Sequence, residues 1–179
     1  MRFLYFTLIM SMLLCFTVGN KINPMSRVTS VDSIDKAELL FNLVKDSPPS
    51  VQLYHYTKYY CKVYNVPEWY AFRTLREETG YKGPNHLNYN PKQKSHANAL
   101  GPFQVLLSTG KDMHDDYFPL TRELLLSDIR LNAKLGIKYI AWLFNQYNDW
   151  RTVAGRYNSG KPESQWPAET KRYVKAINS

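Results

Sequence analysis

Residues 128–147, with the sequence DIRLNAKLGIKYIAWLFNQY, decide the fold class of this chain. Apolar side chains recur there every three or four residues, which is the spacing of one face of an α-helix. The stretch therefore predicts an amphipathic helix whose apolar face lies in the core. That face is formed by Leu131, Ala133, Leu135, Gly136, Tyr139, Ile140, Leu143 and Phe144.

Further helices are predicted on both sides of this stretch from capping residues, prolines and glycines. Asp32 or Ser33 can cap a first helix that stops near Pro48, and Asp149 can cap a helix towards the C-terminus. The other predicted helices run over residues 50–63, from Pro67 to Gly80, from Pro102, after a cap at Thr121, over 150–158 and over 163–177.

Residues 81–98, YKGPNHLNYNPKQKSHAN, interrupt this helical pattern with a polar segment rich in Asn, Pro and Lys. A long ordered loop inside a compact domain is often functional. No alternation of apolar and polar residues, which would indicate a strand, persists anywhere in the chain. The predicted fold class is mainly α, a single globular domain with a long polar loop at its active site.

The N-terminal residues 1–19, MRFLYFTLIMSMLLCFTVG, are typical of a secretory signal peptide: a positive charge on Arg2, an apolar run, then small residues. An uncleaved membrane anchor and a lipoprotein signal using Cys15 are the alternatives, although Leu14 precedes that cysteine where a small residue is expected. Polar residues 20–32 are predicted to be a flexible linker. Residues 33–179 are predicted to be one domain, because 179 residues are too few for two well-cored domains.

The net charge indicates the class of partner, and the cysteine content decides whether a disulfide is possible. The chain has a formal net charge of +8, which suits nucleic acid or another anionic polymer. Export favours an anionic cell wall, so we expect no nucleic-acid partner. With the signal peptide removed, Cys61 is the remaining cysteine, which excludes an intramolecular disulfide and predicts a small buried residue.

Glu77 and Glu78 lie at the end of the helix predicted to stop at Gly80. At about 100° per residue, Glu78 shares a partly apolar face with Leu75, whereas Glu77 lies beside Arg73 and is expected to pair with it. Poor solvation and the negative end of the helix dipole both raise the pKa of Glu78. A carboxyl protonated near neutral pH is the proton donor that glycosidic bond cleavage requires.

Three motifs follow one another along the chain: EETGY at 77–81, SHANALGPFQVLLSTG at 95–110 and GRYNSG at 155–160. Together they resemble the soluble-type lytic transglycosylases, a family with an SLT domain that is related to goose-type lysozyme. The family patterns are Glu-Ser-Gly-aromatic, then Ser-x-x-Gly-Ala-x-Gly-x-x-Gln, then Ala-Tyr-Asn-x-Gly. The resemblance covers about residues 50–176, and it implies a lysozyme-like fold. Asn98 stands where the family has a glycine, and Arg156 replaces a small residue.

The resemblance also implies roles for individual residues. Glu78 corresponds to the sole catalytic acid and base. The substrate-binding residues carried over are Ser95, which lines the sugar site; Phe103, an apolar residue against the sugar; Gln104, which hydrogen-bonds the glycan; Tyr157, whose hydroxyl orients the catalytic carboxyl; and Asn158, which supports the same turn. We expect no metal and no cofactor, since the four histidines show no metal-ligand spacing.

The implied activity is cleavage of the MurNAc-(β1,4)-GlcNAc bond of peptidoglycan, with a 1,6-anhydro-muramyl product. A lysozyme-type hydrolase and a non-catalytic peptidoglycan-binding module are the alternatives. We expect an exported monomer in the periplasm or cell envelope whose partner is the glycan strand, with a secretion apparatus or a phage as a second partner. Contact with a membrane is expected only through an uncleaved N-terminal segment.

Overall fold

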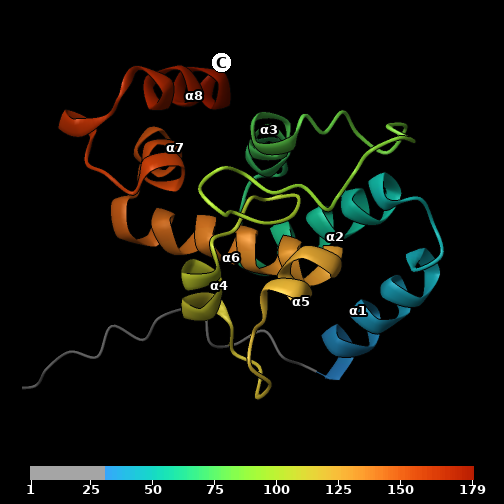
Figure 1. Ribbon diagram of the computed structural model, residues 1–179. Helices are drawn as coiled ribbons and strands as arrows, with labels where there is room; N and C mark the ends of the chain where they lie inside the picture. Colours follow the sequence, from blue (N-terminus) through green and yellow to red (C-terminus); the bar gives the residue numbers. More distant parts are fainter. Residues whose placement is uncertain (1–30) are drawn as a thin grey trace, which may run out of the picture.

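The computed structural model describes residues 31–179, which form eight α-helices and a short 3-10 helix (Figure 1). These elements are α1 (Val31–Val44), α2 (Pro49–Tyr64), α3 (Glu68–Thr79), α4 (Leu107–Met113), α5 (Arg122–Ser127), α6 (Ile129–Tyr147), α7 (Trp150–Ser159), η2 (Glu163–Gln165) and α8 (Ala168–Asn178). Within this range no strand is present, and the two β-bridges are isolated. The mainly α fold class predicted from the sequence is confirmed.

The N-terminal predictions fall largely beyond this range. The signal peptide and residues 20–30 of the linker lie outside the described residues, whereas residues 31 and 32 already belong to α1. Asp32 and Ser33 are therefore in the first turn of the helix and not at its cap. None of the helices in residues 31–179 is long and apolar enough to cross a membrane.

Helix α6 runs through the middle of the molecule and packs against α2, α4, α5 and α7 (Figure 1). It begins one residue after the predicted start, since Asp128 is its cap: the Asp128 carboxylate accepts a hydrogen bond from the backbone N–H of Leu131 over 2.9 Å. This bond satisfies a donor that the first turn of a helix leaves unpaired. The buried residues of α6 are Asn132, Ala133, Leu135, Gly136, Ile137, Ile140, Ala141 and Leu143.

Helices α3, α7 and α8 gather at one end of the molecule. Figure 1 shows α8, at the C-terminal end of the chain, above α7 and beside α3, and α8 packs against both. The face of α8 that it buries carries Thr170, Tyr173, Val174 and Ile177, at the spacing of one side of a helix. This packing brings side chains of α3 next to side chains almost a hundred positions later.

The segment between α3 and α4 contains the predicted polar loop and is fastened to the helices by side chains. Asn132 of α6 is fully buried, and its amide donates to the carbonyls of Leu100 and Leu125 and accepts from the N–H of Phe103. Gly101 passes so close to Asn132 that a Cβ there would lie 2.4 Å from the amide nitrogen. The loop therefore follows a fixed path across α6.

Two helices begin later than predicted. The helix expected from Pro102 begins at Leu107, because Gly101 and Gln104 both have positive φ, at 72° and 47°, which an α-helix does not allow. The helix expected over 163–177 is broken by Pro167, which has extended backbone, so α8 begins one residue later. The 3-10 helix η2 lies in the connection between α7 and α8.

Candidate active site

Glu78 lies in the last turn of α3, which ends at Gly80. Gly80 has a left-handed φ of 67°, and its N–H donates to the carbonyl of Arg76 over 2.9 Å. Glycine takes this conformation without a clash from a Cβ. At this helix end Glu78 is partly buried, and its Oε1 accepts a hydrogen bond of 2.7 Å from the hydroxyl of Tyr173 on α8.

The environment of Glu78 favours its protonated form. Burial raises the pKa of Glu78 from 4.5 to about 7, the hydrogen bond from Tyr173 lowers this pKa, and the charge of Glu77 raises it. Burial acts most strongly because a carboxylate loses its hydration when it leaves water. The raised pKa expected from the sequence is confirmed, and a carboxyl of this kind can donate or accept a proton at neutral pH.

Glu77 is exposed on the same helix end, but its expected ion pair with Arg73 is not formed. The Arg73 guanidinium donates to the carbonyl of Ile177 over 3.0 Å and lies over the ring of Trp69. Among the ion pairs within residues 31–179, none joins Arg73 to Glu77. Arg73 therefore links α3 to the end of α8 and does not neutralise the charge of Glu77.

Two tyrosines approach the catalytic candidate, and their contacts differ from those inferred from the sequence. The hydroxyl of Tyr157 donates to the carbonyl of Phe103 over 2.6 Å, so the hydroxyl that contacts Glu78 directly is that of Tyr173. The pKa values of both tyrosines are raised, first by burial and then by the nearby charge of Glu78. Both hydroxyls therefore stay protonated, and both remain hydrogen-bond donors.

Tyr173 is the site residue that the sequence interpretation missed. Its place on the buried face of α8 follows from the helical spacing, but that spacing indicates a core position and gives no partner. The contact with Glu78 depends on how α8 packs on α3.

Three of the predicted residues line one cavity of about 260 Å³: Gln104, Tyr157 and Asn158. Gln104 is held by its own amide, which donates to the carbonyl of Gly101 over 2.7 Å. The Asn158 amide oxygen accepts a hydrogen bond of 2.7 Å from Thr170 of α8. Polar groups from the loop and α7 thus meet around a hollow large enough for part of a sugar ring system, and α8 holds Asn158 from behind through Thr170.

Phe103 is not a surface residue of this cavity, which corrects the interpretation from the sequence. Its side chain is fully buried and packs on Gly136 of α6, where a Cβ would lie 2.5 Å from that of Phe103. The side chain therefore belongs to the core and does not face a sugar. Its backbone carbonyl, as the acceptor for Tyr157, is the part of Phe103 that is linked to the site.

Ser95 lies in an exposed turn, and its hydroxyl accepts a hydrogen bond from the N–H of Ala99 over 3.0 Å. Asn98 in the same turn has a left-handed φ of 63°. Among residues other than glycine, asparagine adopts this conformation most readily. The departure from glycine at position 98 therefore leaves the turn intact.

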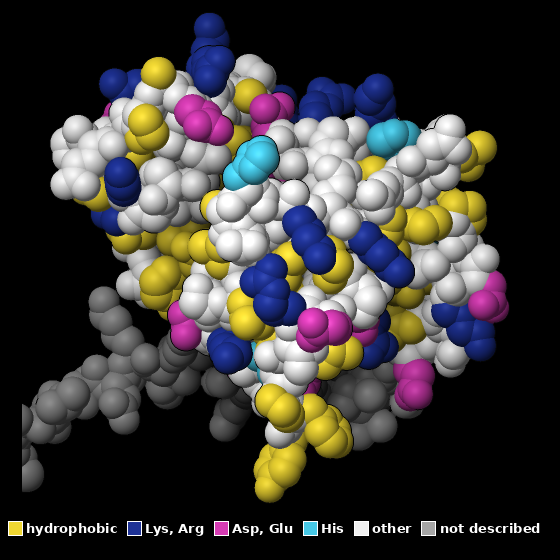
Figure 2. Space-filling model, in the orientation of Figure 1, with side chains coloured by type: hydrophobic (Ala, Val, Ile, Leu, Met, Phe, Trp, Pro, Cys, Tyr) yellow, Lys and Arg dark blue, Asp and Glu magenta, His cyan; other side chains and the backbone are white. Residues whose placement is uncertain are grey.

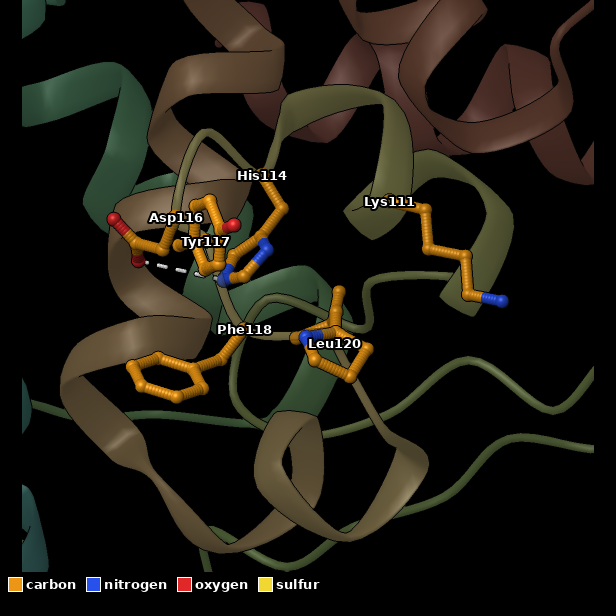
Figure 3. A pocket seen from close by; sticks show the side chains of 7 residues that line it. Lys111, His114, Asp116, Tyr117, Phe118 and Leu120 are labelled. Carbon is orange, nitrogen blue, oxygen red and sulfur yellow. Dashed lines mark ion pairs between the residues drawn. The ribbon is translucent and has the colours of Figure 1, made fainter.

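A separate cavity of about 330 Å³ lies at the segment between α4 and α5 (Figure 3). Figure 3 shows His114 turned toward Asp116, and the two side chains form an ion pair of 3.3 Å when the histidine is protonated. None of the six predicted site residues lines this cavity. Within residues 31–179, no group of three or more His, Cys, Asp and Glu side chains is arranged to hold a metal ion.

Comparison with known families gives a match over the second half of the polar loop and the helices that follow it. A family model described as the transglycosylase SLT domain matches residues 88–178, just over half of the chain. The chain belongs to the transglycosylase SLT domain family. No curated protein matches it.

Membership of the SLT family assigns the chain lytic transglycosylase-type activity on peptidoglycan at the level of the family. The matched range contains Gln104, Tyr157, Asn158 and Tyr173. It begins after Glu78, so the case for this carboxyl rests on its position in the structure.

Proposed function

We propose that this SLT-family protein cleaves the bond between N-acetylmuramic acid and N-acetylglucosamine with Glu78 as its general acid and base. The observation that supports this role is the Glu78 carboxyl, which is partly buried, receives the Tyr173 hydrogen bond and has a pKa raised to about 7. A group with this pKa is close to half ionised at neutral pH. It can therefore give a proton in one step and take one back in the next.

In the first step, protonated Glu78 donates its proton to the oxygen that links the two sugars, and this bond breaks. An oxocarbenium-like centre develops at the muramyl anomeric carbon. The ionised Glu78 then takes the proton of the muramyl 6-hydroxyl, whose oxygen attacks the anomeric carbon. The product is a 1,6-anhydro end, and Glu78 is protonated again.

The surroundings of Glu78 favour this internal attack. Glycosidases that use water commonly need a pair of carboxylates on opposite sides of the bond. The neighbouring carboxylate, Glu77, is exposed and turned about 100° around the helix from Glu78. The groups that lie against the Glu78 carboxyl are tyrosines, and the Tyr173 hydroxyl stabilises its ionised form while the second proton transfer takes place.

We further propose that the cavity lined by Gln104, Tyr157 and Asn158 binds the glycan beside the cleaved bond. Amide and hydroxyl groups suit the hydroxyl and acetamido groups of amino sugars. Ser95, exposed at the edge of the loop, remains a proposed contact with the same strand. Phe103 is left out, because its side chain is fully buried.

The proposed substrate lies outside the cytoplasm, and we propose that residues 1–19 direct the protein to the periplasm or cell envelope. The chain carries 23 Lys and Arg against 15 Asp and Glu, and Figure 2 shows basic side chains spread over the face in view. This excess supports binding to an anionic wall. We propose a monomer that acts on glycan strands, and a secretion apparatus or a phage particle as the second partner class to test.

Digestion of purified sacculi, followed by mass spectrometry of the soluble products, tests the reaction. The wild type should release fragments with 1,6-anhydro ends, and Glu78→Gln should release none. Glu77→Gln is the matched control, because it removes the adjacent exposed carboxylate and should keep turnover. Reducing ends in place of anhydro ends would identify a hydrolase. If the wild type bound sacculi and released no fragments, it would be a binding module, and the proposed reaction would be wrong.

A further inference from the structure

Arg156 introduces a charge into the cavity that Gln104 and Tyr157 share. It lies on α7 directly before Tyr157. Of the described residues that line the cavity, Arg156 alone carries a charge. A cation in a hollow without a carboxylate attracts an anionic group from solution.

The contacts of Arg156 hold the guanidinium but leave its charge without a counter-ion. One Nη donates to the carbonyl of Gly160 over 3.0 Å, and the guanidinium lies 4.8 Å from the ring centre of Tyr147. Its Nε is buried and has no hydrogen-bond partner in the described structure. A guanidinium has five N–H donors, so the bond to Gly160 leaves donors that a ligand can use.

Four other cations of the described helices are paired with carboxylates. The ion pairs join Lys58 to Glu68, Lys134 to Asp116, Lys138 to Asp115 and Arg151 to Glu163. None of the ion pairs within residues 31–179 includes Arg156. Arg156 is therefore held in position by a carbonyl and a ring, neither of which neutralises it.

We propose that Arg156 recognises a carboxylate of the glycan substrate and makes the cavity selective for strands that carry one. This inference rests on the proposed function, because it takes the cavity of Gln104 and Tyr157 as the place where the glycan binds. A planar guanidinium matches a carboxylate with two parallel hydrogen bonds, and a ligand carboxylate can accept from the Nη–H groups that the bond to Gly160 leaves free.

Peptidoglycan offers this carboxylate from two sources. Stem peptides end in free carboxyl groups, while the lactyl group of muramic acid becomes a free carboxylate once the peptide has been removed. Recognition of the first makes the enzyme prefer strands that carry peptides, and recognition of the second makes it prefer denuded strands. The chemistry of Arg156 is the same in both cases.

Binding, rather than turnover, tests this inference, so its result does not depend on whether the proposed reaction takes place. The full chain with Glu78→Gln is titrated with three soluble glycan preparations: strands with peptides, strands denuded by an amidase, and peptide-bearing strands whose carboxyls have been converted to amides. Arg156→Gln is added to this background, and Lys62→Gln, which removes an exposed charge from α2, is the matched control.

Arg156→Gln should raise the Kd about 10-fold for strands with peptides or for denuded strands, and the preparation affected identifies the source of the carboxylate. Lys62→Gln should change the Kd by less than about 2-fold. On amidated strands the ratio of the two Kd values, with and without Arg156, should fall toward one. A loss that persists on amidated strands, or equal Kd values for Arg156→Gln and Lys62→Gln on all preparations, would overturn the inference.

The variant Arg156→Lys shows whether a loss of binding comes from the missing guanidinium or from a misfolded protein. Lysine keeps the charge but lacks the planar fork, so it should give an intermediate loss on the carboxylate-bearing strands and no loss on the amidated ones. Thermal unfolding of each variant shows whether α7 has kept its packing. An Arg156→Lys variant that folds but binds amidated and carboxylate-bearing strands with the same loss would also refute carboxylate recognition.

Discussion

Substitution of Glu78 by Gln should change how the stability of the protein depends on pH. Gln has nearly the same shape, and its carbonyl oxygen can still accept the hydrogen bond from Tyr173. It has no proton to lose, so it stays neutral at every pH. The difference in unfolding free energy between the variant and the wild type therefore isolates the ionisation of Glu78.

The magnitude follows from the pKa of Glu78, which is raised from 4.5 to about 7 in the folded protein. The folded state binds this proton more tightly than the unfolded state does. The carboxyl therefore contributes its full stabilisation below pH 4.5, and this is lost as pH rises to about 7. At about 1.4 kcal/mol for each pKa unit, the wild type should lose about 3 kcal/mol relative to Glu78→Gln across this window.

Urea unfolding of both proteins, followed by tryptophan fluorescence at several pH values from 4 to 8, measures this difference. Other titrating groups contribute equally to both proteins and cancel. The gap in favour of Glu78→Gln should widen between pH 4.5 and 7 and be flat on either side. A gap that stays constant across the whole range, or that narrows as pH rises, would refute the claim that burial raises the pKa of Glu78.

Further changes around the site should have distinct effects. Tyr173→Phe removes a hydrogen bond that lowers the pKa of Glu78, so the alkaline limb of the pH–rate profile should move to higher pH; an unmoved limb would contradict this coupling. Asn132→Ala leaves the buried N–H of Phe103 without its acceptor and removes a donor from the carbonyls of Leu100 and Leu125, although Leu100 keeps its bond from Val105; it should destabilise the fold by about 3 kcal/mol in urea unfolding, whereas a loss under about 1 kcal/mol would show that the loop is held by other contacts. Asn98→Val should cost about 1–2 kcal/mol because a branched side chain is strained at a φ of 63°, while Asn98→Gly should be nearly neutral; equal costs would argue against that strain.

Local sequence was enough to predict the parts of the fold that depend on spacing and caps. Helix α5 begins after Thr121 and α7 after Asp149, as their capping side chains indicate, and α3 ends at Gly80 as a C-terminal glycine predicts. Helix starts were predicted less well at Pro102 and in the stretch before Pro167. At Pro102 the backbone follows a turn with positive φ at Gly101 and Gln104, packed against the distant Asn132, whereas before α8 the extended backbone of Pro167 interrupts the helical pattern.

The candidate site divides in the same way. Helical spacing alone separated Glu78 from Glu77 and gave the direction of its pKa, because the two neighbours point to different sides of one helix. Spacing could not show whether the Phe103 side chain lies in the core or against a sugar, since an apolar side chain suits both environments. The structure places it in the core.

The sequence by itself determined the helical class, the family motifs and the carboxyl at the end of α3, because each depends on residues within a few turns of one another. Only the tertiary structure decided which hydroxyl reaches that carboxyl. Tyr173 contacts Glu78 because α8 packs on α3, while Tyr157 is turned to the carbonyl of Phe103. Contacts of this kind join residues far apart in the chain, and their geometry is set by how whole helices pack, which no local pattern records.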